Sequence, residues 1–515
     1  MMGSRIEDQG SEIENRRSRA KDRGMGIDAI LDPRSSILDP RVALTALFSP
    51  SYADGPVPGG QIQQALERVA KELRWSEEER GPFGRMIPRG ARVLIKPNLV
   101  LHQNEGPWGI DPLVTHLSVI RAVVEGALRA GPSEVLIGDA PLQGCDFQRL
   151  LSVTGLGAWA DGLMRLEPVF KGVRDFRRTT CVFVNGVRLA TEDLQPEEGF
   201  ILFDLGRNSL LEPIADGRNS FRVTCYDPRL LSRTHSPGRH QYLVAREVIE
   251  ADVIINLPKL KTHKKAGITC ALKNLIGING NKEYLPHHRL GGSQTGGDCY
   301  PDYNMIKRAL EFTFDRENMT SSFVMAKVWH GVGRQFIRAL RLTGDRVGTD
   351  GSWSGNDTIW RTCLDLNRIL LYGRPDGTMA GQPQRQVLHV VDAVVAGQGD
   401  GPLCPQPLPL GLILAGRNAA AVDRVGAHLL GYDPERLSIV REAFGDIQWP
   451  IASFEPGDVA ILGDWKAGHA DRVFCERENL MPVIHPIGWR DAALPASGGA
   501  RKSPQSSTVS KNLKL

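Results

Sequence analysis

Short apolar runs alternate with segments of helical periodicity through the middle of the chain. Residues 92–101 begin with β-branched and aliphatic side chains, and Pro97 ends that run as a strand. Residues 115–131 carry apolar side chains at helical spacing, and residues 134–139 form a second apolar run. A strand, a helix and another strand in this order predict two parallel strands joined by a right-handed crossover.

The same alternation returns towards the C-terminus. Apolar runs typical of buried strands lie at residues 253–257, 387–391 and 410–415. Helical spacing follows at residues 267–278 and 419–430, where Asn418 is placed to cap the second helix and Gly431 to end it. Strands that are apolar almost throughout are typical of a sheet buried on both faces. We therefore predict an α/β fold with a mostly parallel sheet covered by helices on both faces.

Two long stretches do not follow this alternation, and we interpret them as insertions in the core sheet. The first, at about residues 145–250, contains TTCVFVNGVRLAT, in which Asn185-Gly186 is a strong signal for the turn of a β-hairpin. The second, at about residues 299–385, is predicted to be mainly helical. We expect one α/β core domain over residues 41–460 that carries both insertions.

The ends of the chain are polar. Residues 1–40 and 495–515 are low in aromatic side chains, as is typical of disordered tails, and we interpret residues 461–494 as a C-terminal extension. The N-terminal residues lack the apolar core of a signal peptide, and no apolar run approaches the roughly 18–20 residues that cross a bilayer. We therefore expect a cytoplasmic protein without a membrane span.

Composition narrows the classes of function. The 515 residues are 41% hydrophobic and 24% charged, as in ordinary globular proteins, and the formal net charge is only +4. Such a balance gives no general attraction for nucleic acid, so affinity for anions must come from a local cluster. The two closest of the eight cysteines, Cys270 and Cys299, are 29 positions apart. Zinc and iron–sulfur sites usually need a closer pair, so we expect no iron–sulfur cluster.

The most informative stretch is residues 251–278, in which an apolar run leads into a cluster of basic side chains. The cluster comprises Lys259, Lys261, His263, Lys264 and Lys265, followed by Lys273 and Asn274. Open α/β sheets bind ligands at the carboxyl ends of their strands, and lysine is a point-charge donor to phosphate or carboxylate. The start of the following helix would add backbone N–H groups. We predict an anion site here; the alternative is a solvated lysine loop.

Other strand ends carry polar residues of the same kind. Lys96 and Asn98 follow the first apolar run, and Asp139 ends the next one. Lysine is rarely buried without a partner, so Lys96 and Asp139 are either site residues or a structural ion pair. Asp392 precedes AGQGDGP, a flexible glycine loop whose backbone N–H groups either face a ligand or form a turn. Asp423, in the first turns of a later helix, suits the helix dipole.

Two further groups are weaker candidates. His287, His288 and Asp298 contain donors for a divalent metal, but adjacent histidines in a loop cannot easily share one ion. A surface or anion-binding role is therefore preferred for the histidines. Asp357 and Arg361 have the i,i+4 spacing of a helix-surface ion pair.

These stretches together resemble the uncharacterised family catalogued as domain of unknown function 362. The resemblance rests on VLIKPNLV, EVLIGDAP, ADVIINLPKLKTHKKAGITCALKNLIGI and VVDAVVAGQGDGP with its continuation, and it covers roughly residues 90–435. It implies an α/β core and one common region formed by Lys96, Asn98, Asp139, Lys259, Lys261, His263, Lys273, Asn274, Asp392 and Asp423. Some relatives are fused to ferredoxin-like iron–sulfur modules, whose close cysteine spacing this chain lacks. Residues 287–302 and 356–361 look like those of a subgroup associated with bacterial polysaccharide genes.

Our leading functional hypothesis is an enzyme, of unknown reaction class, whose substrate is a small anion that carries phosphate or carboxylate and is either free or linked to a sugar. Lys96, Asn98, Lys259, Lys261, Lys273 and Asn274 would bind this substrate. His263 would carry a proton, and Asp139 and Asp392 would act as general acid or base or as ligands of Mg²⁺. Two alternatives stay open: a non-catalytic ligand-binding or assembly partner in a polysaccharide pathway, and a redox protein. The oligomeric state is not indicated.

Overall fold

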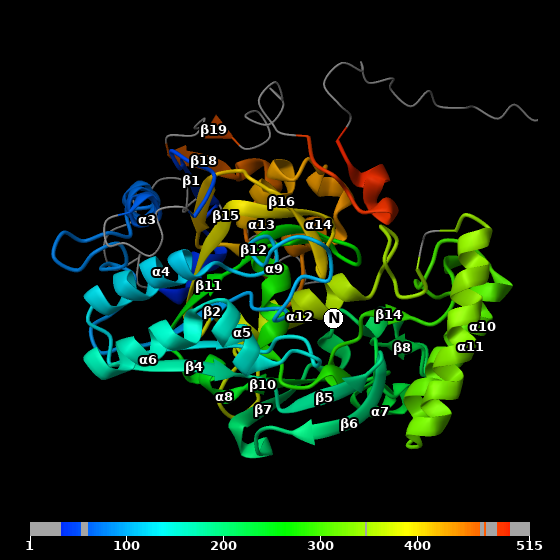
Figure 1. Ribbon diagram of the computed structural model, residues 1–515. Helices are drawn as coiled ribbons and strands as arrows, with labels where there is room; N and C mark the ends of the chain where they lie inside the picture. Colours follow the sequence, from blue (N-terminus) through cyan, green and yellow to red (C-terminus); the bar gives the residue numbers. More distant parts are fainter. Residues whose placement is uncertain (1–31, 53–59, 346–347, 464–467, 470–481, 495–515) are drawn as a thin grey trace, which may run out of the picture.

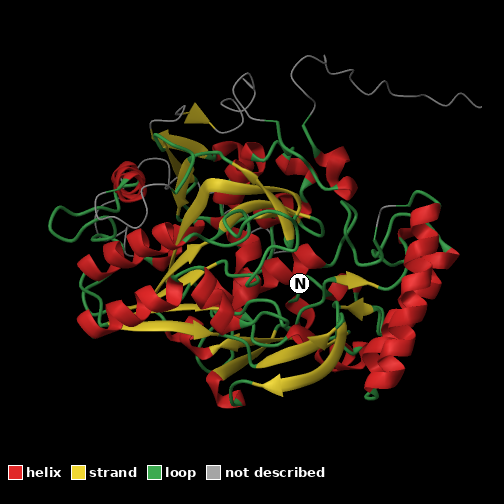
Figure 2. Cartoon of the chain, in the orientation of Figure 1, coloured by secondary structure: helices red, strands yellow, loops and turns green. Residues whose placement is uncertain are grey.

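A large central sheet organises the molecule (Figures 1 and 2). The computed structural model describes residues 32–52, 60–345, 348–463, 468–469 and 482–494. Across the sheet the strands follow the order β19 (Gly468–His469), β18 (Ala460–Gly463), β1 (Arg41–Ala46), β17 (Leu412–Gly416), β15 (Gln386–Asp400), β11 (Val253–Leu257), β2 (Arg92–Pro97), β3 (Glu134–Asp139) and β4 (Phe170–Asp175). Beyond the end of β11, the sheet continues with β12 (Lys259–His263), β13 (Gly267–Thr269) and β16 (Cys404–Leu408).

Most neighbouring strands of the main path are parallel. β4, β3, β2, β11 and β15 all run in one direction. β17 is antiparallel to both β15 and β1, and β18 is again parallel to β1. The predicted mostly parallel sheet is therefore confirmed, with β17 as the main exception.

Helices cover both faces of the sheet because alternate strand residues enter two different apolar cores. In β2, Val93 and Ile95 belong to one core, whereas Leu94 belongs to the other. The first core is covered by α3 (Gln61–Glu72), α4 (Leu117–Arg129), α5 (Phe147–Val153) and α6 (Leu156–Leu166). The second is covered by α9 (Ala271–Asn274), α12 (Ile359–Tyr372), α13 (Ala419–Leu429) and α14 (Ser438–Arg441).

The capping and ending signals of two predicted helices are found in the structure. The side chain of Asn418 caps α13 by accepting hydrogen bonds from the N–H groups of Ala420 at 3.0 Å and Ala421 at 3.1 Å. Gly131 and Gly431, which follow α4 and α13, have positive φ angles of 77° and 70°. Such a conformation favours glycine at a helix end.

The basic segment differs from the predicted loop and helix. Residues 259–263 form the buried strand β12, which pairs with β15 and turns back into β13. Residues 267–278 do not form one helix: β13 is followed by the four-residue α9 and a 3-10 turn, Leu275–Ile278. Strand pairing of the lysines was missed because period-2 burial cannot be recognised where the buried side chains are charged.

The first predicted insertion begins later than expected. β4 lies within residues 145–250, but it pairs in parallel with β3, so α5, α6 and β4 complete a further β–α–β unit of the core. The insertion proper contains β5 (Thr179–Val184), β6 (Val187–Asp193), β7 (Phe200–Asp204), β8 (Phe221–Arg222), α7 (Pro228–Thr234), β9 (His235–Ser236), β10 (Arg239–Ala245) and α8 (Arg246–Glu250). β5 and β6 form the predicted hairpin, and Asn185 and Gly186 have φ angles of 54° and 80°. Positive φ at both positions is what a type I′ turn requires.

The second predicted insertion is also only partly an insertion. α10 (Met305–Met319) and α11 (Phe323–Leu342) form a helix hairpin at the right of Figure 1, away from the central sheet. In α12, by contrast, every residue except Arg361 is buried, and Trp360, Leu364 and Ile369 belong to the core. α12 is therefore part of the layer that covers the sheet.

The predicted disordered tail of residues 1–40 extends too far along the chain. Residues 33–37 form a 3-10 turn that the side chain of Asp32 caps, and Ser35, Ser36 and Asp39 are buried. Residues 1–31 and 495–515 lie outside the described residues, and residues 461–494 are described only in part. Within the described ranges, no helix combines the length and the apolar character that crossing a bilayer requires.

Candidate functional site

Polar residues gather where the parallel strands end. Asn256 of β11 stands in register between Lys96 of β2 and His389 of β15. Further along, Lys259 of β12 stands opposite Asp392 of β15. Polar side chains at the carboxyl ends of β2 and β11, in the first half of β15 and at the start of β12 can therefore interact.

Lys96 and Asp139 form a buried ion pair. The Nζ atom of Lys96 lies 2.6 Å from Oδ1 of Asp139, and both side chains are at most 3% exposed. Nζ also donates to the carbonyl of Pro97 and to Oδ1 of Asn274, while Oδ2 of Asp139 accepts from the N–H of Leu99. Burial lowers the pKa of Lys96, and the charge of Asp139 opposes this effect. The three ammonium protons are all used within the protein.

Asparagine side chains extend this pair into a network. Oδ1 of Asn274 accepts from Lys96 and from Nδ2 of Asn98, and Nδ2 of Asn274 donates to Asn256 at 2.8 Å. Nδ2 of Asn256 in turn lies 3.1 Å from Nδ1 of His389. A Cβ on Gly277 would lie only 2.0 Å from Oδ1 of Asp139, so the backbone there closes over the pair. The structure thus brings Lys96, Asn98, Asp139 and Asn274 into direct contact.

Lys259 and Asp392 form a second buried ion pair, on the opposite face of the sheet. Val390 and Val394, which alternate with Asp392, belong to the core covered by α3–α6. Nζ of Lys259 lies 2.7 Å from Oδ2 of Asp392, and both side chains are fully buried. Lys96 alternates with Leu94 of the other core, so Lys259 and Asp392 lie across the sheet from Lys96.

Tyr52 and His116 complete the second pair. The Tyr52 hydroxyl accepts from Lys259 at 2.6 Å and donates to Oδ1 of Asp392 at 2.6 Å, and the N–H of His116 donates to Oδ2 of Asp392. The rings of Tyr52 and His116 are stacked, with centroids 3.7 Å apart. Burial lowers the pKa of Lys259, and Asp392 opposes this effect.

Lys261, two residues after Lys259, has no such partner. Among the described residues, its buried Nζ donates only to the carbonyl of Leu113, at 2.6 Å. Burial lowers its pKa well below the ordinary value, and the charges of Lys259 and Lys273 lower it further. The charge of Asp139 opposes these effects, but the ammonium group has no carboxylate within ion-pair distance among the described residues.

Two further lysines belong to this environment: the charge of Lys273 acts on Lys261, and it also acts on Lys282. Lys273 and Lys282 are partly buried, and neither forms an ion pair with a carboxylate in the described parts of the chain. Burial lowers the pKa of Lys273, and Lys265 and Lys96 lower it further. Burial and Lys273 lower the pKa of Lys282 to about 8. Lys265 does have a partner, since its Nζ lies 3.5 Å from Asp350.

His263 and His287 belong to the same cationic environment. Burial, followed by the charges of nearby lysines, holds the pKa of both imidazoles well below the ordinary value. Nδ1 of His263 faces the N–H groups of Lys265 and Ala266, so it is an acceptor and the proton of the neutral ring is on Nε2. Nδ1 of His287 faces the carbonyl of Leu285 at 2.7 Å, so it carries the proton and Nε2 is an acceptor. The two neutral rings are thus opposite tautomers.

We use the name cationic cluster for Lys261, His263, Lys273, Lys282 and His287. The charges of its members act on one another: Lys261 and Lys273 lower the pKa of His263, and Lys273 and Lys282 lower that of His287. A separate hollow of about 320 Å³ lies between β6, α7 and the start of α11, and none of the cluster residues lines it.

The helix that follows the basic segment has no free N-terminus. The buried carboxylate of Asp423 accepts from the N–H of Ala271 at 2.6 Å and from that of Leu272 at 3.3 Å. Burial raises the pKa of Asp423 to about 7. The expected contribution of this helix start to anion binding is therefore wrong, because a side chain of α13 already occupies it. The side chains of Leu437 and Trp489 fill the space beside Gly267, so an anion cannot approach there.

The glycines near Asp392 belong to a strand. Residues 397–400 are the end of β15, not a flexible loop. A Cβ on Gly397 would lie 2.7 Å from Cβ of Lys261, and one on Gly401 would lie 1.9 Å from the carbonyl oxygen of Thr262. These glycines allow β12 and β15 to pack closely.

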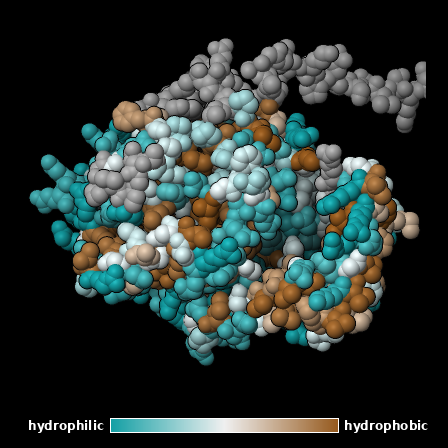
Figure 3. Space-filling view, viewed as in Figure 1, coloured by the Kyte–Doolittle hydropathy of each residue, from teal (hydrophilic) through white to brown (hydrophobic). Residues whose placement is uncertain are grey.

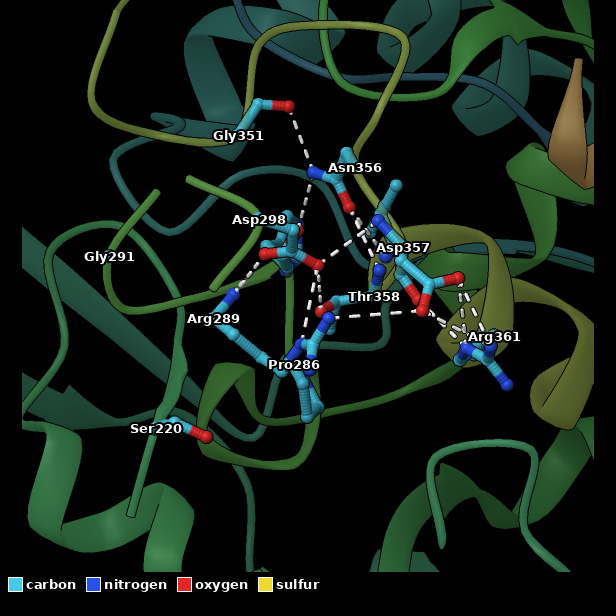
Figure 4. A network of polar contacts seen from close by, with 12 residues as sticks. Ser220, Pro286, Arg289, Gly291, Asp298, Gly351, Asn356, Asp357, Thr358 and Arg361 are labelled. Carbon is cyan, nitrogen blue, oxygen red and sulfur yellow. Dashed lines mark hydrogen bonds and ion pairs between the residues drawn. The ribbon is translucent and has the colours of Figure 1, made fainter. Parts of the chain in front are cut away.

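Asp298, a candidate metal ligand in the sequence, instead anchors the start of α12 (Figure 4). Oδ2 of Asp298 accepts from the N–H of Asp357 at 3.0 Å and from the hydroxyl of Thr358 at 2.6 Å. Oδ1 of Asn356 accepts from the N–H groups of Thr358 and Ile359 at the start of α12, and Nδ2 of Asn356 donates to the carbonyl of His287 at 3.0 Å. No group of three His, Cys, Asp or Glu side chains that could hold a metal ion occurs among the described residues. The network fixes the backbone of His287.

Asp357 and Arg361 form the expected i,i+4 pair, with 3.1 Å between Oδ1 and Nη2. Arg361 also donates to the carbonyls of Asp357 and Leu210, which connects α12 to the first insertion. The pair is structural.

Comparison with known proteins shows to which family the chain belongs. The family described as Domain of unknown function (DUF362) matches residues 93–185 and 212–428. The chain belongs to this family. A DUF362-like resemblance was expected from the four sequence stretches, and it is confirmed.

Relatives add little to the DUF362 assignment. The thylakoid-associated protein sll1697 of Synechocystis is 26% identical over 205 residues, which are 40% of this chain and 44% of that protein. A crystal structure of a Thermotoga maritima protein has 11% identity and a TM-score of 0.31, covering 72% of this chain and 58% of that one. The lactate racemase apoprotein of Thermoanaerobacterium thermosaccharolyticum has 11% identity and a TM-score of 0.28, covering 77% and 58%. These TM-scores carry no argument about function.

Sequence reasoning missed several residues of this DUF362 site. Tyr52 precedes the family match, and His116 caps α4 through Nδ1. Asn256 lies inside an apolar strand, where its polar side chain was the signal that could have identified it. Lys282 begins a three-residue 3-10 turn, Lys282–Tyr284, which is too short to leave a pattern in the sequence.

Proposed function

We propose that this protein is an enzyme that binds a small, multiply charged anion, bearing phosphate or carboxylate, at the cationic cluster. The observation that carries the proposal is the imbalance of charge. Lys96, Lys259 and Lys265 each have a carboxylate partner, whereas Lys261, Lys273 and Lys282 form no ion pair with a carboxylate of the described residues.

Uncompensated ammonium groups away from water are costly, and they either lose their protons or acquire an anion. A bound phosphate or carboxylate would remove the mutual repulsion of the three lysines and favour their charged forms. Because Lys273, Lys282 and His287 retain some exposure, a small ligand can reach the cluster. The paired residues would hold the surrounding strands in position.

The two histidines suit different roles. The Nε2–H group of His263 would donate a hydrogen bond to the anion, and its low pKa keeps the ring neutral near pH 7. Nε2 of His287 would accept a hydrogen bond from the substrate, and it would act as a general base once the charge of the bound anion offsets the lysines that lower the pKa of the ring. Since the carboxylate oxygens of Asp139 and Asp392 already accept from lysine and backbone N–H groups, we propose that both are positioning residues. For the same reason they do not fit the donor set of Mg²⁺.

A non-catalytic partner is the second candidate. The Synechocystis relative is named for its association with the thylakoid, not for a reaction, which supports this candidate. Lysines that dock an acidic protein surface would need to project from the molecule, however, and Lys261 is fully buried. This burial favours a small ligand over a protein partner.

The proposal is tested by anion binding to the full chain. Inorganic phosphate, pyrophosphate, citrate and a uridine diphosphate sugar are titrated against the protein, with thermal shift and calorimetry as readouts. Lys261→Met and Lys273→Met should each weaken the tightest of these anions by about 1.5–3 kcal/mol, the value of a charge-assisted hydrogen bond. Lys71→Met, on the exposed side of α3, is the matched control and should bind normally. The proposal is contradicted if none of these anions shifts the melting temperature. It is also contradicted if both variants bind the anions as tightly as the unchanged protein does.

A further inference from the structure

The outer face of the α10–α11 hairpin exposes many bulky apolar side chains. They are Met305, Phe312, Val324, Met325, Val328, Val332 and Leu342. The exposed fractions of Val324, Val328 and Leu342 are 69%, 51% and 89%. In Figure 3 this hairpin forms the right-hand end of the molecule, where hydrophobic and hydrophilic residues lie side by side. Exposed apolar surface of this kind marks an interaction site.

The exposed side of α11 consists of two parallel stripes. The apolar stripe contains Val324, Val328 and Val332, each one helical turn after the last. The basic stripe contains Lys327, Arg334, Arg338 and Arg341, all exposed. The 20 residues of α11 include no aspartate or glutamate. The helix is therefore amphipathic, with a purely cationic polar side.

The acidic residues of α10 all face inward. Glu311 accepts from the N–H of Gly291 and the hydroxyl of Tyr300, Asp315 pairs with Arg222 at 2.9 Å, and Glu317 lies 3.1 Å from Nδ1 of His330. Arg308 and Arg316 of α10 point outward, and Arg316 lies over the ring of Phe312 at 4.9 Å. Every exposed charge of the two helices is thus positive.

Close packing makes the hairpin a firm platform. Ala326, Gly333 and Leu340 are buried at seven-residue intervals on the inner side of α11. A Cβ on Gly333 would lie 3.1 Å from Oγ1 of Thr313, so the glycine lets α10 and α11 approach. The rings of Phe312 and Trp329 meet edge to face, with centroids 5.9 Å apart. A helix of this length presents its face over about 30 Å.

We propose that the outer face of α10–α11 binds the surface of an anionic lipid bilayer. The valine stripe and Leu342 would enter the boundary between headgroups and acyl chains. The basic stripe would contact lipid phosphates and carboxylates, with the arginine stems lying along the apolar surface. The helix would lie in the plane of the membrane, because its inner side is already packed against the protein.

A bilayer fits this face better than other anionic partners. Nucleic acid would match the basic stripe but would leave the aliphatic stripe in water. An acidic helix of another protein would need a groove, whereas here the apolar side chains stand on the outer side of a hairpin. A bilayer has an apolar interior below anionic headgroups, so it complements both the apolar stripe and the basic stripe.

The test is co-sedimentation of the full chain with vesicles of phosphatidylcholine, with or without phosphatidylserine, at low and high salt. The chain should bind only the anionic vesicles, and salt should weaken this binding. R334Q/R338Q/R341Q should lower the partition coefficient on the order of 100-fold, since each basic residue near an anionic surface contributes roughly a factor of five. V324S/V328S/V332S should lower it at least about tenfold.

Two controls separate this surface from general charge effects. R165Q/L166S removes an exposed cation and an exposed leucine from the end of α6 and should bind vesicles like the unchanged chain. The valine variant should keep its retention on heparin while losing vesicle binding. No binding of the unchanged chain to anionic vesicles overturns the proposal, as does undiminished vesicle binding by both hairpin variants. Binding to heparin alone would indicate a nucleic-acid or polyanion surface instead and would likewise overturn it.

Discussion

Lys259 and Lys261 are two residues apart on one strand, and both are fully buried, yet their surroundings are opposite. Lys259 lies 2.7 Å from Asp392 and shares a hydroxyl with it. Lys261 has a single carbonyl partner and two lysines nearby. Lys96 resembles Lys259, and Lys273 resembles Lys261.

The difference teaches how to separate structural from functional charge. A buried lysine with a carboxylate is part of the scaffold, because the ion pair satisfies it whether or not a ligand is present. A buried or half-buried lysine without a carboxylate partner gains a countercharge only when an anionic ligand binds. Residue type and burial are the same in both cases, so the countercharge is the informative quantity.

The largest effect is expected for Lys259→Met. This change leaves the Asp392 carboxylate buried without its cation, which costs about 3–5 kcal/mol. Urea unfolding followed by tryptophan fluorescence measures the loss. Lys261→Met is the matched comparison and should leave the stability of the ligand-free protein unchanged or raised, because it removes an uncompensated charge. A similar loss in both variants would mean that Lys261 has a countercharge after all.

Asp423 extends the comparison to a buried acid. It is a buried carboxylate for which no ion pair occurs within the described residues. Its pKa rises from about 3.9 in the unfolded chain to about 7 in the folded protein. The stability that its protonation contributes is complete below about pH 4 and is lost as the pH rises through 7, at no more than about 1.4 kcal/mol per pH unit. Asp423→Asn keeps the acceptor for Ala271 and Leu272 and should remove this slope. Urea unfolding between pH 4 and 8 checks it.

The control for this pH effect is Asp161→Asn, on the exposed side of α6. It should leave the slope as it is in the unchanged protein. Persistence of the slope in Asp423→Asn would assign it to another group.

The smallest effect is expected for Tyr52→Phe. It removes one acceptor of Lys259 and one donor to Asp392 while keeping the stacking on His116. A loss of about 1.5–3 kcal/mol of unfolding free energy is expected for hydrogen bonds to charged groups. Anion binding at the cationic cluster should not change. Weaker anion binding in this variant would show that the two regions are coupled.

Local patterns predicted the elements of the fold well. The strands at 92–97, 134–139 and 253–257, the Asn418 cap and the Asn185-Gly186 turn each follow from a few neighbouring residues. The extent of the insertions was less predictable, because only pairing with a distant strand shows that β4 belongs to the sheet.

The candidate site was predictable as a region and not as a set of roles. Lys96 and Asp139 are 43 positions apart, and Tyr52 is 207 positions from Lys259. No local pattern encodes which lysine receives a carboxylate over such a separation. Asp423 illustrates the same limit, because it caps a helix start 152 positions earlier in the chain.

β1 and Tyr52 lie outside the residues that define the family, which begin at 93 and end at 428. β1 nevertheless lies between β17 and β18, and Tyr52 bridges the Lys259–Asp392 pair. A fragment cut to the homologous segment would uncover an edge of β17 and leave a buried ammonium short of an acceptor. The central sheet therefore extends beyond the family match on both sides, to β1 at Arg41 and to β18 at Gly463.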